Sequence, residues 1–210
     1  SVWDIDGTLV DSRDVIFDCC SHALTEIGLP APTYDAVRQI VGLSLEHALS
    51  VLAPGLSPAQ VQRVADGYKS RFHQHRARPG FVEPLYDGAA DCLRRLTSEG
   101  WRLAIATGKS RRGVEMIVET HGWQNMFQST HCADDGPGKP HPAMLLEAMR
   151  ANGATPQETI MIGDMAHDMR MARSAGAWAL GVSWGFNTAA ELQAAGAHHV
   201  SDSFAILNKQ

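Results

Sequence analysis

The sequence predicts an α/β protein: a doubly wound parallel sheet with an inserted, all-helical cap. From Leu85 onward, short apolar runs alternate with helical patterns, which is typical of a parallel sheet covered by helices on both faces. Residues 13–83 instead contain helical patterns and no convincing strand, although a strand and a turn precede them. We therefore expect a discontinuous core of residues 1–12 and 84–210, with residues 13–83 as the cap.

The first elements follow from apolar spacing and from the residues that begin and end helices. Val2 and Trp3 form a short apolar strand, and Gly7 allows the chain to turn sharply after it. Apolar residues recur at intervals of three and four over 12–27, which predicts a helix that ends at Gly28. Within the cap, Ser57 before a proline predicts the start of the longest helix.

The second half of the chain predicts four more strands, each followed by a helix or loop. Asp87 is the expected cap of the first of these helices, which a glycine ends at position 100. The predicted strands are 103–106, 127–132, 159–162 and 178–182, and the further helices are 110–120, 142–152, 169–175 and 188–195. Ligands of such sheets bind at the carboxyl ends of the strands, so we expect the functional site there.

Composition limits the function classes. Hydrophobic residues make up 44% of the 210 residues and charged residues 20%, as in a soluble globular protein. The net charge of -5 argues against a nucleic-acid partner, and no apolar run approaches the roughly 20 residues that a membrane span needs. We expect a cytoplasmic protein without a signal peptide, although the short first strand leaves open whether residues precede Ser1.

Four cysteines show no C-x-x-C spacing, and two of them are adjacent in a helical pattern. They are therefore expected to be reduced thiols: Cys19, Cys20, Cys92 and Cys132.

Two aspartates at the end of the first strand are the first candidate site residues. Asp4 and Asp6 are two positions apart, so an extended chain points them to the same face. Two carboxylates this close repel each other and need a cation or a shared proton. Mg²⁺ binds one or two carboxylates together with phosphate oxygens and water. An isolated D-x-D could also be a polar turn, because such turns are common.

Polar residues also follow three later strand-like or loop segments and would reach the same edge of the sheet. Thr107 follows an apolar strand, and Lys139 lies in a loop before a helix. A phosphate there could accept hydrogen bonds from the Thr107 hydroxyl and from the charged Lys139. Asp164 and Asp168 follow another apolar strand and could complete or orient a metal site.

Together these segments resemble the four motifs of the haloacid dehalogenase superfamily of phosphatases. The motifs are DxDGTLxDS at the start, a strand that ends in Thr107, a lysine before proline at Lys139, and GDxxxD at 163–168. The strings VGLSLEHAL, ATGKS and KPHP are most similar to the phosphoglycolate phosphatase-like subgroup, which has a small helical cap. The resemblance covers essentially the whole chain and implies a Rossmann-like core.

The resemblance also implies a role for each motif residue. Asp4 would be the nucleophile that forms an aspartyl-phosphate, and Asp6 the general acid and base. Thr107 and Lys139 would hold the phosphoryl group and complete the catalytic set. Mg²⁺ would be bound by Asp4, the Asp6 backbone carbonyl and Asp164, with Asp168 as a supporting acid. The implied substrate-binding residues are Gly7, Thr8, Thr107, Gly108, Lys109 and Lys139.

The leading hypothesis is a Mg²⁺-dependent phosphomonoester hydrolase, monomeric or homodimeric, that acts on a small phosphorylated metabolite and binds neither nucleic acid nor membrane. A phosphosugar mutase of the same superfamily is the alternative, because the same motifs serve both reactions. Dehalogenases of the superfamily lack the second aspartate, which is present here as Asp6. Phosphonate hydrolases of the superfamily use a lysine of the cap to form a Schiff base, and the expected cap contains a single lysine, Lys69. A non-enzymatic, receiver-like signalling domain is a less favoured alternative, because such domains have no helical insert.

Three further segments receive weaker interpretations. The basic stretch 69–78 is expected to be a solvated surface, and His167 part of a loop. Trp184-Gly185-Phe186 is interpreted as a loop beside the site. Gly42-Leu43-Ser44 is expected on the cap side of the cleft, on the strength of the VGLSLEHAL string alone.

Overall fold

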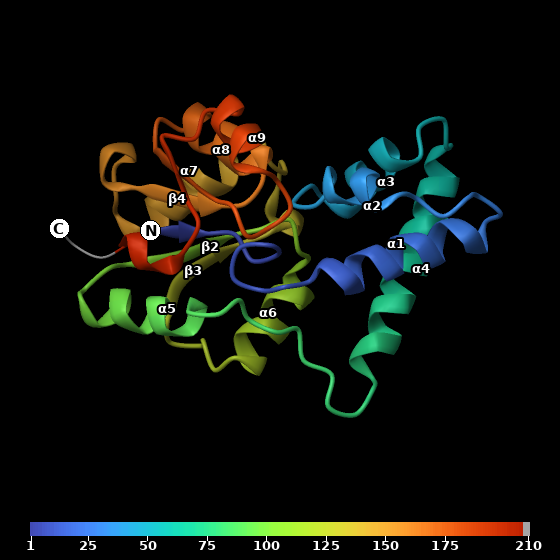
Figure 1. Cartoon of the computed structure of the whole chain (residues 1–210), viewed down its shortest axis with the longest axis horizontal. Helices are drawn as coiled ribbons and strands as arrows, with labels where there is room; N and C mark the ends of the chain where they lie inside the picture. Colours follow the sequence, from blue (N-terminus) through green and yellow to red (C-terminus); the bar gives the residue numbers. More distant parts are fainter. Residues whose placement is uncertain (208–210) are drawn as a thin grey trace.

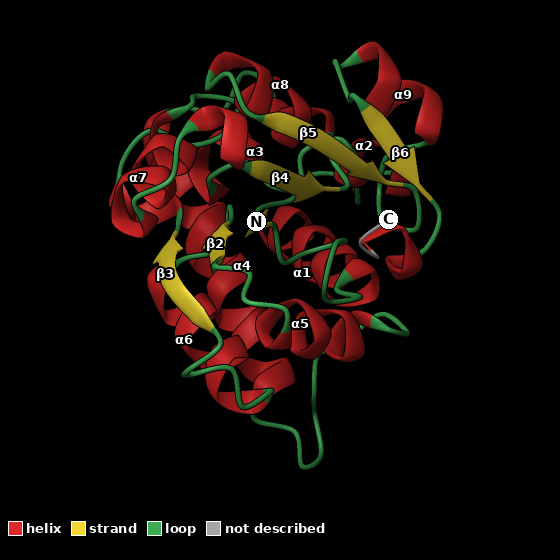
Figure 2. Ribbon diagram, turned by 90° about the vertical axis from the view of Figure 1, so that its left-hand side faces the viewer, coloured by secondary structure: helices red, strands yellow, loops and turns green. Residues whose placement is uncertain are grey.

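The computed structural model describes residues 1–207 and shows a six-stranded sheet in which all neighbouring strands are parallel (Figure 2). The strand order is β3-β2-β1-β4-β5-β6, so the direction of winding reverses at β1. The predicted α/β fold is therefore confirmed. The strands are β1 (Val2–Trp3), β2 (Leu103–Ala106), β3 (Phe127–His131), β4 (Ile160–Gly163), β5 (Trp178–Val182) and β6 (His199–Ser201).

The short central strand β1 places the site. Val2 pairs with Ala104 of β2 on one side and with Met161 of β4 on the other. The chain then turns, and the Ile5 carbonyl accepts hydrogen bonds from the backbone N–H groups of the next turn. Asp4 thus stands at the carboxyl end of β1, at the switch point where ligands bind in sheets of this order.

Helices cover both faces of the sheet (Figure 1). Side chains of successive strand residues point to opposite faces, so Trp3 and Ile105 pack on one side, while Val2 and Ala104 pack on the other. The first side is covered by α5 (Ala89–Ser98) and α6 (Arg111–Thr120), and the second by α7 (Ala143–Asn152), α8 (Ala166–Ser174) and α9 (Ala189–Ala194). Short 3-10 helices lie at Ala133–Asp135, Pro156–Glu158 and Phe204–Leu207.

The segment between β1 and α5 carries four helices and no named strand, and these cap helices lie on the right in Figure 1. They have two apolar clusters, one of which includes Met165 and Phe186 from the core and so packs the cap against the sheet edge. The helix start predicted at Ser57 is confirmed, and Gln60 completes a capping box with it, which was not predicted. The cap helices are α1 (Arg13–Glu26), α2 (Tyr34–Arg38), α3 (Leu45–Leu52) and α4 (Pro58–Arg76).

The chain enters and leaves the cap through two adjacent crossings. The Asp11 N–H donates to the Pro84 carbonyl at 2.8 Å, and Val10 forms an antiparallel bridge with Leu85. The two ends of the cap segment are therefore held side by side.

Two local predictions were wrong, and one strand was not predicted. Helix α5 is preceded by Gly88 at φ +86°, not capped by Asp87, because the left-handed turn there suits glycine. Helix α8 begins three residues early, since the Asp168 carboxylate accepts a hydrogen bond from the Met165 N–H and stabilises its first turn. Strand β6 was not predicted, because its three residues include a single apolar one.

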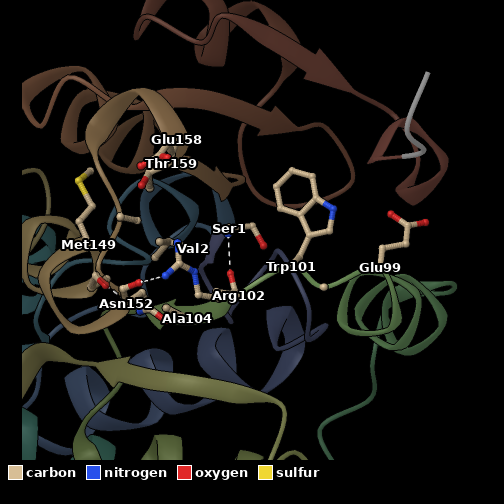
Figure 3. A pocket seen from close by; sticks show the side chains of 13 residues that line it. Ser1, Val2, Glu99, Trp101, Arg102, Ala104, Met149, Asn152, Glu158 and Thr159 are labelled. Atoms are coloured by element: carbon tan, nitrogen blue, oxygen red, sulfur yellow. Dashed lines mark hydrogen bonds between the residues drawn. The ribbon is translucent and has the colours of Figure 1, made fainter.

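The amino edge of the sheet carries a pocket of about 290 Å³, which includes Ser1, Arg102 and Asn152 in its lining (Figure 3). It lies at the opposite end of the strands from the predicted site. All four cysteines are buried and free. Within residues 1–207, no helix has both the length and the apolar character needed to cross a membrane.

Candidate active site

The residues predicted from the four motifs meet at the carboxyl edge of the sheet. Asp4 follows β1, Thr107 follows β2, and Asp164 follows β4. Lys139 reaches them from the loop before α7, and Asp168 lies in the first turn of α8. All five side chains are buried, so the charges of the three aspartates and the lysine interact with little screening by water.

Lys139 joins two of the acids. Its Nζ lies 2.9 Å from Asp4 Oδ1 and 2.6 Å from Asp168 Oδ1. Burial lowers the pKa of Lys139, but the carboxylates of Asp168 and Asp4 outweigh burial and raise the pKa above its ordinary value. The two acids therefore favour the charged form of the lysine between them.

One carboxylate oxygen of Asp4 is ion-paired, and the other is available to a ligand. Its Oδ1 is paired with Lys139, whereas Oδ2 is buried and has no hydrogen-bond partner among residues 1–207. Burial raises the pKa of Asp4, and the ion pair with Lys139 opposes the shift. A buried carboxylate oxygen without a partner is destabilising unless a ligand or cation satisfies it.

Asp164 is held by both of its oxygens. Oδ1 accepts a hydrogen bond from the Thr8 hydroxyl at 2.8 Å, and Oδ2 accepts one from the Phe186 N–H at 2.8 Å. Burial raises the pKa of Asp164 well above its ordinary value, and the nearby carboxylates of Asp4 and Asp168 add to the shift.

Two glycines make room for Asp164. A Cβ at Gly7 or at Gly185 would overlap the Asp164 carboxylate. Next to Gly185, the Trp184 indole N–H donates to the Thr8 carbonyl at 3.0 Å. The loop 184–186 therefore orients Asp164, a role that the sequence did not reveal. The available signal was a glycine between two aromatic residues directly after a strand.

The three buried acids fit a divalent cation. One carboxylate oxygen from each of Asp4, Asp164 and Asp168 lies within 4.8 Å of the others. If all are ionised, three carboxylates beside the single ammonium of Lys139 leave two negative charges, which one divalent ion neutralises. The donors are all oxygens, as Mg²⁺ prefers. The Asp6 side chain is not in this cluster.

Thr107 has its hydroxyl in position for a ligand. Its N–H is bonded to the His131 carbonyl at 3.0 Å, which fixes the residue at the end of β2. The Thr107 hydroxyl oxygen accepts a bond from the Lys109 N–H at 3.3 Å, and its own proton is donated to no residue in the described part of the chain.

Lys109 was predicted to contact the substrate, but in the structure its ammonium pairs with acids. Its Nζ lies 2.9 Å from Asp6 Oδ1 and 3.0 Å from Glu83 Oε1. Burial lowers the pKa of Lys109, but Asp6 and Glu83 outweigh it and hold the pKa above its ordinary value. The other Glu83 oxygen lies 3.3 Å from Arg76 of the cap. A chain of ion pairs thus runs from the cap through Glu83 and Lys109 to Asp6.

Glu83 was not predicted from the sequence as a residue of the site. It is buried although it is charged, and it lies just before the second crossing between cap and core. The Phe72 ring of α4 lies against both cations of this series of ion pairs. The distance from the ring centre is 4.4 Å to the Arg76 guanidinium and 5.4 Å to the Lys109 ammonium. No local pattern marks a glutamate in a loop as the partner of a lysine 26 residues away.

The cap touches the core closely at Gly108. A Cβ there would lie 2.8 Å from the Leu43 carbonyl oxygen and closer still to Gly42. Gly42, Leu43 and Ser44 line a pocket of about 420 Å³ between cap and core, which also reaches Asp6 and Lys109.

Lys69 and His167 take no part in the acidic cluster. Lys69 pairs with Glu46 at 3.4 Å, and both side chains are about half exposed. The His167 Nε2 is 3.3 Å from the Gln39 carbonyl oxygen, a contact between cap and core.

Comparisons with known proteins found similar sequences and similar structures. The family model described as haloacid dehalogenase-like hydrolase matches residues 1–182. A curated relative named "Probable phosphatase IndB" from Dickeya dadantii is 35% identical over 97% of this chain and 89% of its own length. A phosphoglycolate phosphatase from Pseudomonas putida is 32% identical over 89% of this chain and 70% of its own. The crystal structure of a hydrolase from Pseudomonas syringae is 25% identical, with a TM-score of 0.86 over 96% and 92% of the two chains.

The first prediction from this geometry concerns Glu83. Glu83→Gln removes the charge that Lys109 and Arg76 share, so we expect the free energy of unfolding to fall by about 2 kcal/mol. Urea denaturation measures the change. The matched control is Glu46→Gln, whose pair with Lys69 is half exposed and is expected to contribute within about 0.5 kcal/mol. Equal losses in the two variants would contradict a structural role for the buried chain.

The second prediction concerns the contact between cap and core. Gly108→Ala places a methyl group against the Gly42 and Leu43 carbonyls, so the cap cannot approach as closely. We expect phosphatase activity to fall at least about tenfold, as a small misplacement of catalytic groups allows, while the far-UV circular dichroism stays unchanged. Gly113→Ala is the control, because its Cβ would meet neighbours at ordinary distances of 3.4–3.6 Å. Equal activity in both variants would show that this contact does not matter.

Proposed function

The chain belongs to the haloacid dehalogenase-like hydrolase family, and we propose that it is a Mg²⁺-dependent phosphomonoester hydrolase acting on a small phosphorylated metabolite. The observation that carries the proposal is the state of Asp4. One of its oxygens is paired with Lys139, and the other is buried, unpartnered and beside further acids. A carboxylate in this position suits attack on phosphorus.

In the first step, an Asp4 oxygen attacks phosphorus and the bond from phosphorus to the ester oxygen breaks. The electron pair leaves with that oxygen, which takes a proton from Asp6. Asp6 must therefore enter this step protonated, not as the carboxylate that pairs with Lys109. The ammonium of Lys139 and the hydroxyl of Thr107 hold the phosphoryl oxygens. The products of this step are an alcohol and an aspartyl-phosphate on Asp4.

In the second step, water attacks the phosphorus of the aspartyl-phosphate. Asp6, now a carboxylate, accepts a proton from that water, and the bond between phosphorus and Asp4 breaks. Inorganic phosphate leaves, and both aspartates return to their starting states. Lys109 and Glu83 keep Asp6 oriented in both steps.

Mg²⁺, when bound, would neutralise charge on the phosphoryl group. Its ligands would be Asp4, Asp164 and the Asp6 backbone carbonyl. Asp168 would support the site through its ion pair with Lys139. The charge balance of the cluster supports this assignment.

The proposal includes the division of the chain. Residues 1–12 and 84–210 would form the catalytic core, and residues 13–83 the cap that closes over the site and excludes water. The adjacent crossings at Asp11 and Pro84 support a hinge there. We further propose a cytoplasmic monomer or homodimer that binds neither nucleic acid nor membrane. The net charge and the buried free cysteines support this proposal.

The other candidate functions are not equally compatible with the structure. A Schiff-base role for Lys69 is disfavoured by its exposure and its pair with Glu46, because such lysines are desolvated. A receiver domain is disfavoured by the cap helices. A phosphosugar mutase would use the same groups, and it differs in whether water or a sugar hydroxyl accepts the phosphoryl group. Release of inorganic phosphate in step with alcohol identifies a hydrolase.

The third prediction concerns the metal. EDTA should abolish hydrolysis of p-nitrophenyl phosphate and Mg²⁺ should restore it, because the acids and the phosphate dianion repel each other without a cation. Isothermal titration should show Mg²⁺ binding that Asp164→Asn weakens. Undiminished turnover in chelator would exclude the metal from the reaction.

The fourth prediction separates the two aspartates. Asp4→Asn should remove activity toward every substrate. Asp6→Asn should slow the first step far more with an alkyl phosphate than with p-nitrophenyl phosphate, because p-nitrophenolate leaves without a proton. Acid–base help of this kind is typically worth about 10²–10⁴-fold. Rapid mixing should show a burst of p-nitrophenol followed by slow turnover.

The control for Asp6→Asn is a Mg²⁺ titration that shows a retained metal site. Equal slowing of the first step with both substrates would mean that Asp6 has a structural or metal-binding role and is not the general acid.

A further inference from the structure

The pocket beside Asp6 extends deep into the cap. Its volume of about 420 Å³ falls in the range that accepts ligands much larger than a phosphate with two carbons attached. Asp6, Gly108 and Lys109 line its end toward the core, and most of the remaining lining comes from the cap, from α1, α3, α4 and the loop before α3. This part of the pocket is where the leaving group of a phosphomonoester would lie.

The inner wall is apolar. It consists of side chains from three cap helices that also form the cap's apolar clusters. Two of these side chains, Tyr68 and Phe72 of α4, are aromatic and lie 6.0 Å apart between ring centres. The wall is formed by Ile16, Cys20, Ala48, Leu49, Tyr68 and Phe72.

The charges deep in the pocket are already paired. Arg76 is paired with Glu83, and Lys109 with both Glu83 and Asp6. The other lysine and arginine side chains that line the pocket are Lys69, which pairs with Glu46, and Arg112, which is exposed to solvent. A second anionic group held among α1, α3 and α4 would lose its hydration and would meet only cations that are already paired, because Arg112 is exposed to solvent, which is unfavourable.

We propose that the natural substrate of this site has an uncharged leaving group with an aromatic or branched apolar part, which packs against Tyr68 and Phe72. The proposal rests on the proposed phosphatase function and adds the chemical class of the alcohol. It separates this site from one that is built for a short carboxylate such as glycolate.

The test compares three primary alkyl esters, so that the ease of leaving is similar. They are benzyl phosphate, ethyl phosphate and 2-phosphoglycolate, each assayed by phosphate release at several concentrations. Burial of a phenyl ring should raise kcat/KM for benzyl phosphate about tenfold or more above ethyl phosphate. The kcat/KM for benzyl phosphate should also exceed the kcat/KM for 2-phosphoglycolate.

Two results would overturn the proposal: 2-phosphoglycolate equal to or better than benzyl phosphate, or benzyl phosphate no better than ethyl phosphate. If neither these esters nor p-nitrophenyl phosphate is hydrolysed with Mg²⁺, the proposed function itself fails, which is a distinguishable outcome.

A substitution in the pocket wall tests where the phenyl ring of benzyl phosphate binds. Ala48→Leu adds carbons inside the pocket, so the ratio of kcat/KM for benzyl over ethyl phosphate should fall by on the order of tenfold, the reverse of the gain from burial. His47→Leu is the control, because His47 is exposed on the same helix and should leave the ratio unchanged. An unchanged ratio in folded Ala48→Leu would overturn the placement of the ring. If the variant does not fold, the comparison of substrates with the unaltered enzyme still decides.

Discussion

The buried ammonium of Lys139 between Asp4 and Asp168 is the interaction on which the rest of the site depends. It joins the end of β1, the loop before α7 and the first turn of α8. Losing one partner of a buried pair typically costs about 3–5 kcal/mol, so the position of these three segments is strongly coupled to their charges. Asp168 also stabilises the start of α8 through the Met165 N–H. The same carboxylate thus orients the lysine and starts the helix.

Small residues make this dense packing of charge feasible. A Cβ at Gly163 would overlap Asp168, as one at Gly7 or Gly185 would overlap Asp164. The sheet brings the acids together from separate strands, and glycines allow the chain to pass close beside them. The resulting excess of negative charge is a property of the fold, and it defines what kind of ion the site can accept.

The sequence predicts most of the core because its signals are local. Asp4, Thr107 and Asp164 each follow an apolar run, and the parallel sheet necessarily brings the ends of such runs to one edge. The partner of Lys109 could not be predicted in this way, because the residue that it reaches, Glu83, is brought near only by the packing of the cap. Likewise β6 gains its strand conformation from pairing with β5, since three residues have little preference of their own.

The adjacent crossings at Asp11 and Pro84 have a consequence for how such enzymes diversify. Because the cap segment begins and ends at neighbouring points, its length and internal structure do not disturb the register of the sheet. Under the proposed function, mutations in the pocket wall would change which alcohol is accepted and leave the phosphoryl chemistry unchanged. The proposed reaction centre and the proposed recognition surface would then be carried by separate segments of one chain.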